Sequence, residues 1–196
     1  MLHVDEIRRV LSAYEPHCGR AGDGNRLAAV ALIFAGSTQD PSLLFIERAE
    51  RQGDRWSGQM AFPGGRWEKV DAGMRETAER ETREEVGIEL ASSELLGRLD
   101  DQGGHRAGAP AGLRVSPFVF FLEATEEPVP NEEVQSAMWV PLSVLLDPAR
   151  SIEYRHRGLG GPFEGILVGE PERHVVWGLT RRILRSLVEL LGRKLP

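Results

Sequence analysis

The sequence has a single cysteine, Cys18, among 196 residues. One cysteine excludes a disulfide within the chain and is consistent with a reducing compartment. Runs of about eighteen apolar residues, which a membrane-spanning helix needs, are absent as well. The N-terminal residues MLHVDEIRRVL lack the basic start and apolar core of a secretory leader. We therefore expect a cytoplasmic protein with no membrane partner.

Basic residues are too few for a general nucleic-acid-binding surface. Lys and Arg total 24 against 30 Asp and Glu, which gives a formal net charge of −6, whereas affinity for nucleic acids comes largely from clustered basic side chains. The apolar content of 41% and the charged content of 28% are ordinary for soluble globular proteins. An acidic protein that acts on an anionic small molecule needs local compensation from a bound divalent metal or from arginines.

The chain length suits one compact domain. We expect residues 1–25 to form an N-terminal helix and linker packed on a domain of residues 26–196, with the helix over Val4–Tyr14. The order of elements, strands, a central helix, strands and a terminal helix, predicts an α+β fold with a mixed sheet between helices. The expected strands are Leu27–Phe34, Leu43–Ile46, Leu95–Leu99, Arg114–Glu123 and Met138–Val140, followed by a helical turn at Leu142–Leu146, a hairpin of Ile152–His156 and Phe163–Val168, and a helix over Val175–Leu191.

Residues 64–88, GGRWEKVDAGMRETAERETREEVGI, are the most informative stretch. At roughly 100° per residue, Glu81, Glu84 and Glu85 fall within about a third of the helix circumference. That face also carries Met74, Thr77 and Ala78, whereas the charges Glu76, Glu79 and Arg83 lie opposite. Carboxylates that lie close together on a partly buried helix face have raised pKa values unless a cation neutralises their charge. Because Mg²⁺ and Mn²⁺ prefer such oxygen ligands, we expect one of these ions here.

The residues around this helix fit the same interpretation. A Gly64–Gly65 turn lets bare backbone approach a diphosphate, and a carbonyl there is a candidate further ligand. Arg80 and Glu84 stand at i, i+4 and can pair. Asp71 is a candidate both for a helix cap and for a peripheral ligand, and Gly87 suits a left-handed helix end. The alternative for the whole stretch is a structural acidic helix with paired charges.

This stretch resembles the signature of the Nudix hydrolases, Gx5Ex7REUxEExGU, in which U is aliphatic. The matching positions are Arg80, Glu81, Glu84, Glu85, Gly87 and Ile88. Three positions depart from the pattern: Asp71 replaces the upstream Glu, eight residues rather than seven separate it from Arg80, and Thr82 takes an aliphatic position. The resemblance implies an αβα sandwich with this helix packed on the sheet.

Further similarity extends to the coenzyme A pyrophosphatase branch of that family. The branch shares the first two departures and shows FPGG before the signature and TAxRExxEE within it, as do Phe62–Gly65 and Thr77–Glu85. Trp139–Leu142 and Val176–Leu184 are similar to its downstream segments. Of its upstream pattern LLTxR[SA]x3Rx3Gx3FPGG, the residues Leu44, Arg48 and Ala49 fit. One extra residue lies before Phe62, Ile46 replaces the Thr, and Arg51 and Arg55 are both candidates for the second Arg.

The resemblance implies a Nudix pyrophosphohydrolase, with Glu81, Glu84 and Glu85 as metal ligands and Arg80 among the catalytic residues. Glu81 is also the expected general base, although in this family the base varies and can come from a loop. Glu133 is our loop candidate; its alternative is a solvated acid in the acidic run 126–133. For the substrate side we expect Arg48, Arg55, Gly64, Gly65 and Arg66, the arginines otherwise being ordinary surface residues.

The expected reaction is metal-dependent hydrolysis of a diphosphate linkage, which makes the partner a small-molecule nucleoside diphosphate compound. Three readings of the function stand side by side. The first is cleavage of coenzyme A or acyl-coenzyme A to 3′,5′-ADP and the phosphopantetheine part. The second is hydrolysis of ADP-ribose, a dinucleotide or a nucleotide sugar, and the third is a nucleotide-sensing domain without turnover. Trp56 and Trp67 flank the glycine turn and are either packing residues or stacking partners for an adenine ring. The leucines of the C-terminal helix serve either a homodimer or the core of one chain.

Overall fold

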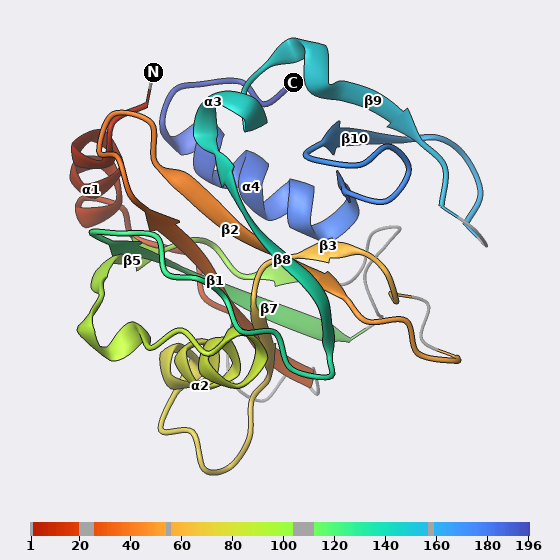
Figure 1. Ribbon diagram of the computed structural model, residues 1–196. Coiled ribbons are helices and arrows are strands. Elements are labelled where there is room, and N and C mark those ends of the chain that lie inside the picture. The colour runs from red at the N-terminus through yellow and green to blue at the C-terminus, as the bar shows by residue number, and fades with distance from the viewer. Residues whose placement is uncertain (1, 20–25, 54–55, 104–111, 157–158) are drawn as a thin grey trace.

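The computed structural model describes residues 2–19, 26–53, 56–103, 112–156 and 159–196. Its main sheet has eight strands in the described part, with the path β3-β2-β1-β7-β5 (Figure 1). The strands are β1 Arg26–Ala35, β2 Ser42–Arg48, β3 Met60–Ala61, β4 Gly64–Arg66, β5 Glu94–Arg98, β6 Gln102–Gly103, β7 Leu113–Leu122 and β8 Val134–Pro141. Off the main path, β4 pairs with β1, β6 with β7 and β8 with β2.

The centre of the sheet is the parallel pair β1 and β7, in register from Arg26 opposite Leu113 to Ala35 opposite Leu122. The other pairings of this sheet are antiparallel, so the sheet is mixed as expected. Successive side chains of β1 enter different cores: Leu32 and Phe34 join one apolar cluster, and Ile33 joins the other. Because side chains alternate across a strand, both faces of the sheet must be covered.

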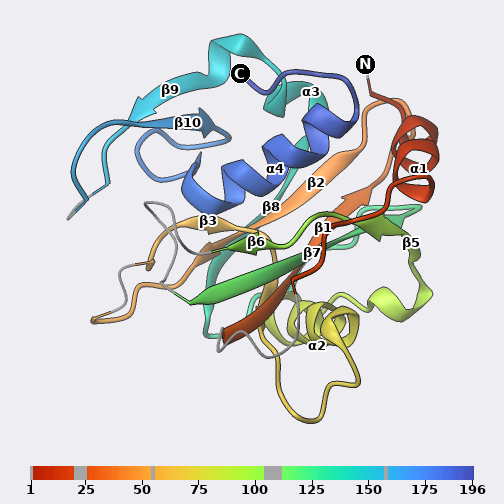
Figure 2. The same ribbon diagram turned by 180° about the vertical axis from the view of Figure 1, so that it is seen from behind.

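Helices cover the two faces (Figures 1 and 2). The helix α2, Met74–Val86, lies on one face, and α1, Val4–Ser12, and α4, Gly178–Leu190, lie on the other. Short turns complete the chain: η1 Leu90–Ser92, α3 Leu142–Leu145 and η2 Pro148–Arg150. The α+β class and the αβα layering predicted from the sequence are therefore confirmed. None of the helices in the described ranges is long and apolar enough to cross a membrane.

A small second sheet stands beside α4. It contains β9 Ser151–Tyr154, β10 Phe163–Leu167 and β11 Val175–Val176 in the order β11-β10-β9. The antiparallel pairing of β9 with β10 confirms the predicted hairpin. The expectation that the last helix begins at Val175 is wrong, because the two valines pair with β10 and the helix begins at Gly178. Between them Trp177 is extended and packs on the rings of Tyr154 and Phe163.

The N-terminal helix packs on the same face as α4. Its residues Val4, Ile7 and Leu11 are buried in the cluster that also contains the apolar residues of α4. After this helix the chain is held to the end of β5, where the hydroxyl of Tyr14 donates to Asp100 at 2.6 Å. The helix α1 is thus attached to the sheet by its apolar residues, and the segment after it by the Tyr14–Asp100 hydrogen bond.

Candidate active site

The turn expected at Gly64–Gly65 is instead a bend at Pro63. The two glycines after this bend lie in strand β4, which pairs with β1 through Gly64 opposite Val30 and Gly65 opposite Ala29. Gly64 has a φ of +149°, and a Cβ there would lie 2.2 Å from the carbonyl oxygen of Ala29. A Cβ on Gly65 would lie 2.4 Å from the carboxyl carbon of Glu81. Neither position accepts a side chain, because one faces backbone and the other faces a carboxylate. The predicted bare backbone at this turn is therefore confirmed, and Glu81 lies against it.

The signature helix α2 begins after Gly73, which supplies no side-chain cap. At its start the backbone N–H of Ala72 donates to Glu76 at 2.6 Å. It ends at Gly87 in the left-handed conformation, with φ +71°, as predicted. Thr82, at the position where the family pattern has an aliphatic residue, is fully buried and donates its hydroxyl to the carbonyl of Ala78 at 2.7 Å. The hydroxyl is thereby satisfied within the helix, so the substitution leaves no unpaired polar group.

Asp71 is not the helix cap that the sequence suggested. Its carboxylate, almost completely buried, accepts from the Nε and Nη2 of Arg80, from the hydroxyl of Thr77 and from the backbone N–H of Glu68. The bonds from Arg80 hold the pKa of Asp71 well below its usual range, against the opposing effect of burial. Because both oxygens are already bonded to protein donors, Asp71 orients Arg80 rather than binding an ion.

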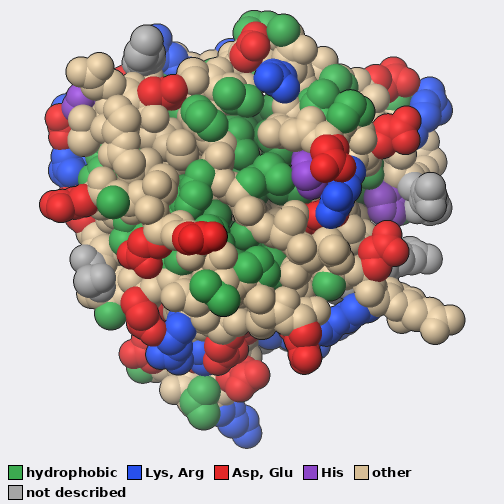
Figure 3. Space-filling view, viewed as in Figure 1, with side chains coloured by type: hydrophobic (Ala, Val, Ile, Leu, Met, Phe, Trp, Pro, Cys, Tyr) green, Lys and Arg blue, Asp and Glu red, His purple; other side chains and the backbone are tan. Residues whose placement is uncertain are grey.

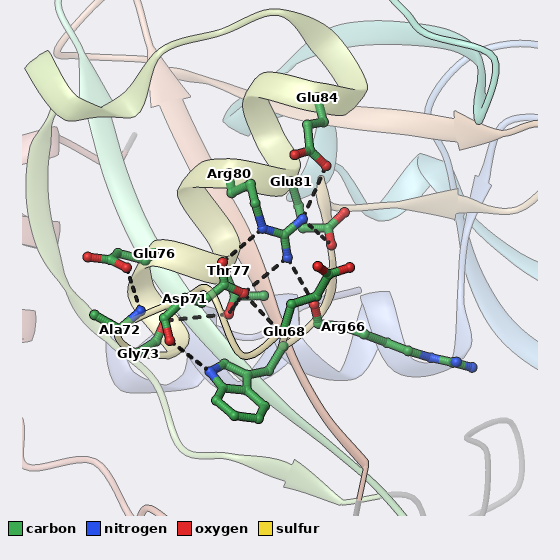
Figure 4. Close-up of polar contacts among 11 residues, drawn as sticks. Arg66, Glu68, Asp71, Ala72, Gly73, Glu76, Thr77, Arg80, Glu81 and Glu84 are labelled. Atoms are coloured by element: carbon green, nitrogen blue, oxygen red, sulfur yellow. Dashed lines mark hydrogen bonds and ion pairs between the residues drawn. The ribbon is translucent and has the colours of Figure 1, made fainter.

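Arg80 connects the turn to the helix (Figure 4). Besides Asp71, its guanidinium donates to Glu81 at 3.0 Å, to Glu84 at 3.1 Å and to the backbone carbonyl of Arg66 at 3.1 Å. The predicted pair with Glu84 is therefore confirmed. The Nε, Nη1 and Nη2 atoms all donate to protein acceptors. Arg80 therefore acts as a positioning residue that holds the Glu81 carboxylate in place.

Two of the expected ligands, Glu81 and Glu85, lie beside the glycine turn. Glu85 is 3% exposed and accepts from the backbone N–H of Gly64 at 2.8 Å. Burial raises the pKa of Glu85 to about 8, opposed by the Gly64 bond and by Arg48, and reinforced by Glu81 and Glu133. Burial likewise raises the pKa of Glu81, opposed by Arg80. The predicted rise in carboxylate pKa is thus present at both residues, and a bound cation would reverse it.

Glu84 differs from its two neighbours. Its side chain is 49% exposed and turned toward Arg80. Accordingly, within the described ranges no three acidic, histidine or cysteine side chains converge closely enough to enclose a metal ion. The sequence predicted three converging glutamates, and this structure brings only Glu81 and Glu85 to the turn. The donor set still fits a hard divalent ion, because desolvated carboxylates have lost the water that would otherwise stabilise their charge.

The opposite face of α2 is an ordinary solvated surface. Arg75 pairs with Glu79 at 2.7 Å, and Arg83 with Glu89 at 3.6 Å. Figure 3 shows acidic and basic side chains interspersed over α2 and the loop before it. Exposed pairs of this kind contribute little to stability. The two charged faces therefore differ as the sequence indicated, one with paired surface charges and one with buried acids.

Glu133, the candidate loop base, lies just before β8 and is held by two contacts from the loop after β2. Its backbone carbonyl accepts from the N–H of Ala49 at 2.8 Å, and its carboxylate pairs with Arg51 at 3.0 Å. Its charge raises the pKa of both Glu81 and Glu85. The carboxylate is half exposed. The structure thus brings Glu133 within electrostatic reach of the signature carboxylates, which the position of Glu133 in an acidic run did not reveal.

A cavity of about 270 Å³ adjoins the turn on the face of the sheet that α4 covers. Its lining includes four of the expected substrate-side residues: Arg48, Gly64, Gly65 and Arg66. The fifth, Arg55, lies outside the described residues. Trp56 lines the cavity, whereas Trp67 does not and donates its ring N–H to the carbonyl of Asp71 at 3.3 Å. Sequence reasoning missed the remaining lining residues, among them Arg26, Leu113, Leu179, Thr180 and Ile183. Their approach depends on the pairing of β1 with β4 and on the packing of α4, which no local pattern reports.

Comparison with known proteins gives three concordant findings. The family model "NUDIX domain" matches residues 24–157. The uncharacterized Nudix hydrolase NudL of Yersinia pestis is 32% identical over 168 residues, covering 84% of this chain and 79% of the relative. A Schizosaccharomyces pombe protein, C14C4.10c, is 42% identical over 115 residues, covering 57% of this chain but only 35% of its own length. This chain therefore matches about a third of that relative.

Solved structures agree in fold. A MutT/nudix family protein from Enterococcus faecalis superimposes with a TM-score of 0.56, covering 96% of this chain and 74% of that one at 14% identity. A NUDIX hydrolase from Alicyclobacillus acidocaldarius does so with a TM-score of 0.50, covering 64% of this chain and 83% of that one at 19% identity. At these identities the likeness establishes the architecture alone.

Proposed function

We propose, since the chain belongs to the Nudix family, that it hydrolyses the diphosphate linkage of coenzyme A or an acyl-coenzyme A. The class of enzyme, a Nudix pyrophosphohydrolase acting on a nucleoside diphosphate derivative, is supported by the family model and by the Nudix hydrolase relatives. Nudix hydrolases generally use divalent metal ions. The choice of Mg²⁺ or Mn²⁺ and of this substrate belongs to the proposal.

One observation carries the proposal: desolvated Glu81 and Glu85 lie at a side-chain-free turn that also borders a cavity. Gly64 and Gly65 let the diphosphate approach the backbone closely. Arg48 lines the cavity, and its charge lowers the pKa of Glu85. An anionic linkage placed there meets a cationic side chain on one side and metal-binding oxygens on the other.

The residues of the site take distinct roles in hydrolysis. Glu81, Glu85 and a reoriented Glu84 would hold the ion, which when bound neutralises the diphosphate and lowers the pKa of a water. Arg80, fixed by Asp71, keeps the Glu81 carboxylate against Gly65. Glu81 accepts the proton of the attacking water, and Glu133 is the alternative acceptor from the loop.

Coenzyme A is the first candidate substrate because of the residues that precede the signature helix. Phe62 and Pro63 precede the glycine pair as they do in the branch that the sequence resembles, and Arg48 of the upstream pattern does line the cavity. The second candidate is ADP-ribose, a dinucleotide or a nucleotide sugar, because the cavity is large enough for one limb of any of these. A sensor without turnover is disfavoured, since it needs no complete set of metal-binding acids.

The test is a turnover assay with Mg²⁺ or Mn²⁺ on coenzyme A, acyl-coenzyme A, NADH, ADP-ribose and nucleoside triphosphates, with products identified by mass. Formation of 3′,5′-ADP from coenzyme A is the expected result. Turnover of ADP-ribose without turnover of coenzyme A would move the enzyme to the second candidate. The absence of turnover of every compound, together with metal-independent nucleotide binding, would favour a sensor.

A further inference from the structure

The described residues that line the cavity beside the active site carry charge of one sign only. Among its described lining residues the charged ones are Arg26, Arg48 and Arg66, with no acidic side chain. The chain as a whole has 30 acidic residues against 24 Lys and Arg. These three arginines line the cavity together with mostly apolar residues, so the local charge is reversed relative to the acidic protein as a whole. Such a reversal attracts an anionic ligand.

Two of these arginines share one face of the sheet. Arg66 stands opposite Ala28 in the pairing of β4 with β1, and Arg26 precedes Ala28 by two residues on the same strand. Residues two apart on a strand point to the same side, so Arg26 and Arg66 are diagonal neighbours, roughly 7–8 Å apart at the backbone. The glycine turn occupies the opposite end of this strand pair. Arg26 therefore lines the part of the cavity that is farther from the two glycines.

The guanidinium groups of Arg26 and Arg66 are available for a ligand. Both side chains are exposed at the rim of the cavity, and neither forms an ion pair with an acidic residue of the described ranges. Figure 4 shows the side chain of Arg66 extending away from Arg80 and the glutamates, although its carbonyl accepts from Arg80. Arg48 is different, because it already acts on Glu85. In this arrangement Arg48 and the metal-binding glutamates serve the diphosphate. Arg26 and Arg66 then remain for a second anionic group of the ligand.

We propose that the cavity receives the nucleoside limb of the substrate and that Arg26 and Arg66 bind a phosphate monoester carried on its ribose. This inference rests on the proposed diphosphate hydrolysis and adds a specificity subsite to it. The apolar floor, which includes Ala28, Val30 and Phe62, accepts the uncharged part of the limb. The arginines then select compounds with a second anionic group that the reaction leaves intact. Arginine is suited to this because its planar fork binds a phosphate through two parallel bonds.

Two kinds of compound carry such a group, one on the 3′ oxygen and the other on the 2′ oxygen of the ribose. The kinetic test therefore uses matched pairs that differ by one phosphate: coenzyme A with dephospho-coenzyme A, and NADPH with NADH. We expect kcat/KM to favour the monoester member of one pair by about tenfold or more. The pair that shows the preference identifies the position of the phosphate.

The variants Arg26→Gln and Arg66→Gln should each lower this preference severalfold, and Arg26→Lys and Arg66→Lys should restore part of it. Arg9→Gln, which removes an exposed arginine of α1 outside the cavity, is the charge-matched control and should leave the ratio at its wild-type value. A ratio of kcat/KM values is insensitive to partial unfolding, because both substrates sample the same folded fraction. A ratio near one in the wild-type protein, or an unchanged ratio in the double Gln variant, would overturn the inference.

A binding measurement separates this inference from the proposed function. Titration calorimetry in EDTA with 3′,5′-ADP, 2′,5′-ADP and AMP needs no turnover. Tighter binding of one bisphosphate than of AMP, lost in the double variant, supports the subsite even if no diphosphate is hydrolysed, in which case only the proposed function fails. Equal binding of all three nucleotides, or binding of none, contradicts the subsite even if coenzyme A is cleaved.

Discussion

The two sides of β4 differ in how their charged groups are satisfied. On the α2 side Arg80 is bonded at every nitrogen, Asp71 is saturated, and Glu81 and Glu85 are pressed against bare backbone. On the α4 side an apolar cavity has exposed arginines at its rim. A saturated network fixes geometry, whereas unpaired groups at a rim leave binding capacity for a ligand. We therefore expect the α2 side to determine the rate of reaction and the α4 side to determine which compound reacts.

The largest expected effect is on the α2 side. Glu81→Gln keeps the shape of the side chain and its contact with Gly65 but removes the charge, so kcat should fall by about 10²–10⁴-fold. Glu79→Gln on the opposite face of the same helix, where the side chain pairs only with Arg75, is the control and should retain kcat. Steady-state kinetics with each metal measures both. If Glu81→Gln raised KM alone, the assignment of the rate to the α2 side would be wrong.

Next in size is the replacement of the residue that organises this network. Arg80→Lys keeps the charge but cannot reach Asp71, Glu81 and Glu84 together. Because Asp71 is buried, we expect a loss of about 3 kcal/mol in the free energy of unfolding. Chemical denaturation monitored by circular dichroism gives this value. Arg75→Lys disturbs only an exposed pair and should change stability by less than about 0.5 kcal/mol. Equal losses in the two variants would mean that the network does not fix the geometry.

The sequence predicted the α2 side far better than the α4 side, for a physical reason. Helical spacing puts Glu81 and Glu85 on one face and Arg80 within reach of Glu84, because these relations are local along one element. The core strands also follow from local pattern, and β1, expected at Leu27–Phe34, is observed at Arg26–Ala35. Glu84 is a local exception, since its pair with Arg80 on the same helix turns it away from the other two acids. The other features that the sequence did not predict depend on contacts between distant segments.

Three errors show this dependence on distant contacts. Asp71 was expected at a helix cap or a metal, yet it serves Arg80, nine residues away, because the loop folds back over the helix. Val175 was expected in a helix, but strand pairing with Leu167 decided its conformation. Arg26 was not singled out at all, since only the register between β1 and β4 places it beside Arg66. Tertiary pairing overrides local preference in each case.

A smaller effect is the dependence of the free energy of unfolding on pH, which tests whether Glu85 is buried without a cation. Burial raises the pKa of Glu85 from 4.5 to about 8, so between these values the folded chain binds more protons than the unfolded chain. In EDTA the free energy of unfolding should therefore fall with rising pH, by up to about 1.4 kcal/mol per pH unit for a full proton. Asp71, with its lowered pKa, stabilises the folded state throughout this range, and its contribution is lost only in more acidic solution.

Denaturation series from pH 5 to pH 8 measure this slope. Mg²⁺ or Mn²⁺ should flatten it, because a bound cation stabilises the charged carboxylates. Glu85→Gln, which has no proton to release, should be flatter than the wild-type protein without metal. A steep slope that persists in Glu85→Gln and in the presence of metal would assign the dependence to other groups.

The smallest expected effect belongs to the α4 side. Leu179 is a lining residue of the cavity from the first turn of α4, and Leu179→Phe places a larger ring toward the floor. We expect KM for coenzyme A to rise by about tenfold or less with kcat nearly unchanged, because the larger ring takes space from the ligand and costs about 1.4 kcal/mol or less of uniform binding. Leu190→Phe, near the other end of the same helix, is the matched control. A fall in kcat without a change in KM would mean that cavity and carboxylates act as one unit, since only coupling across β4 lets a distant apolar contact alter the chemical step.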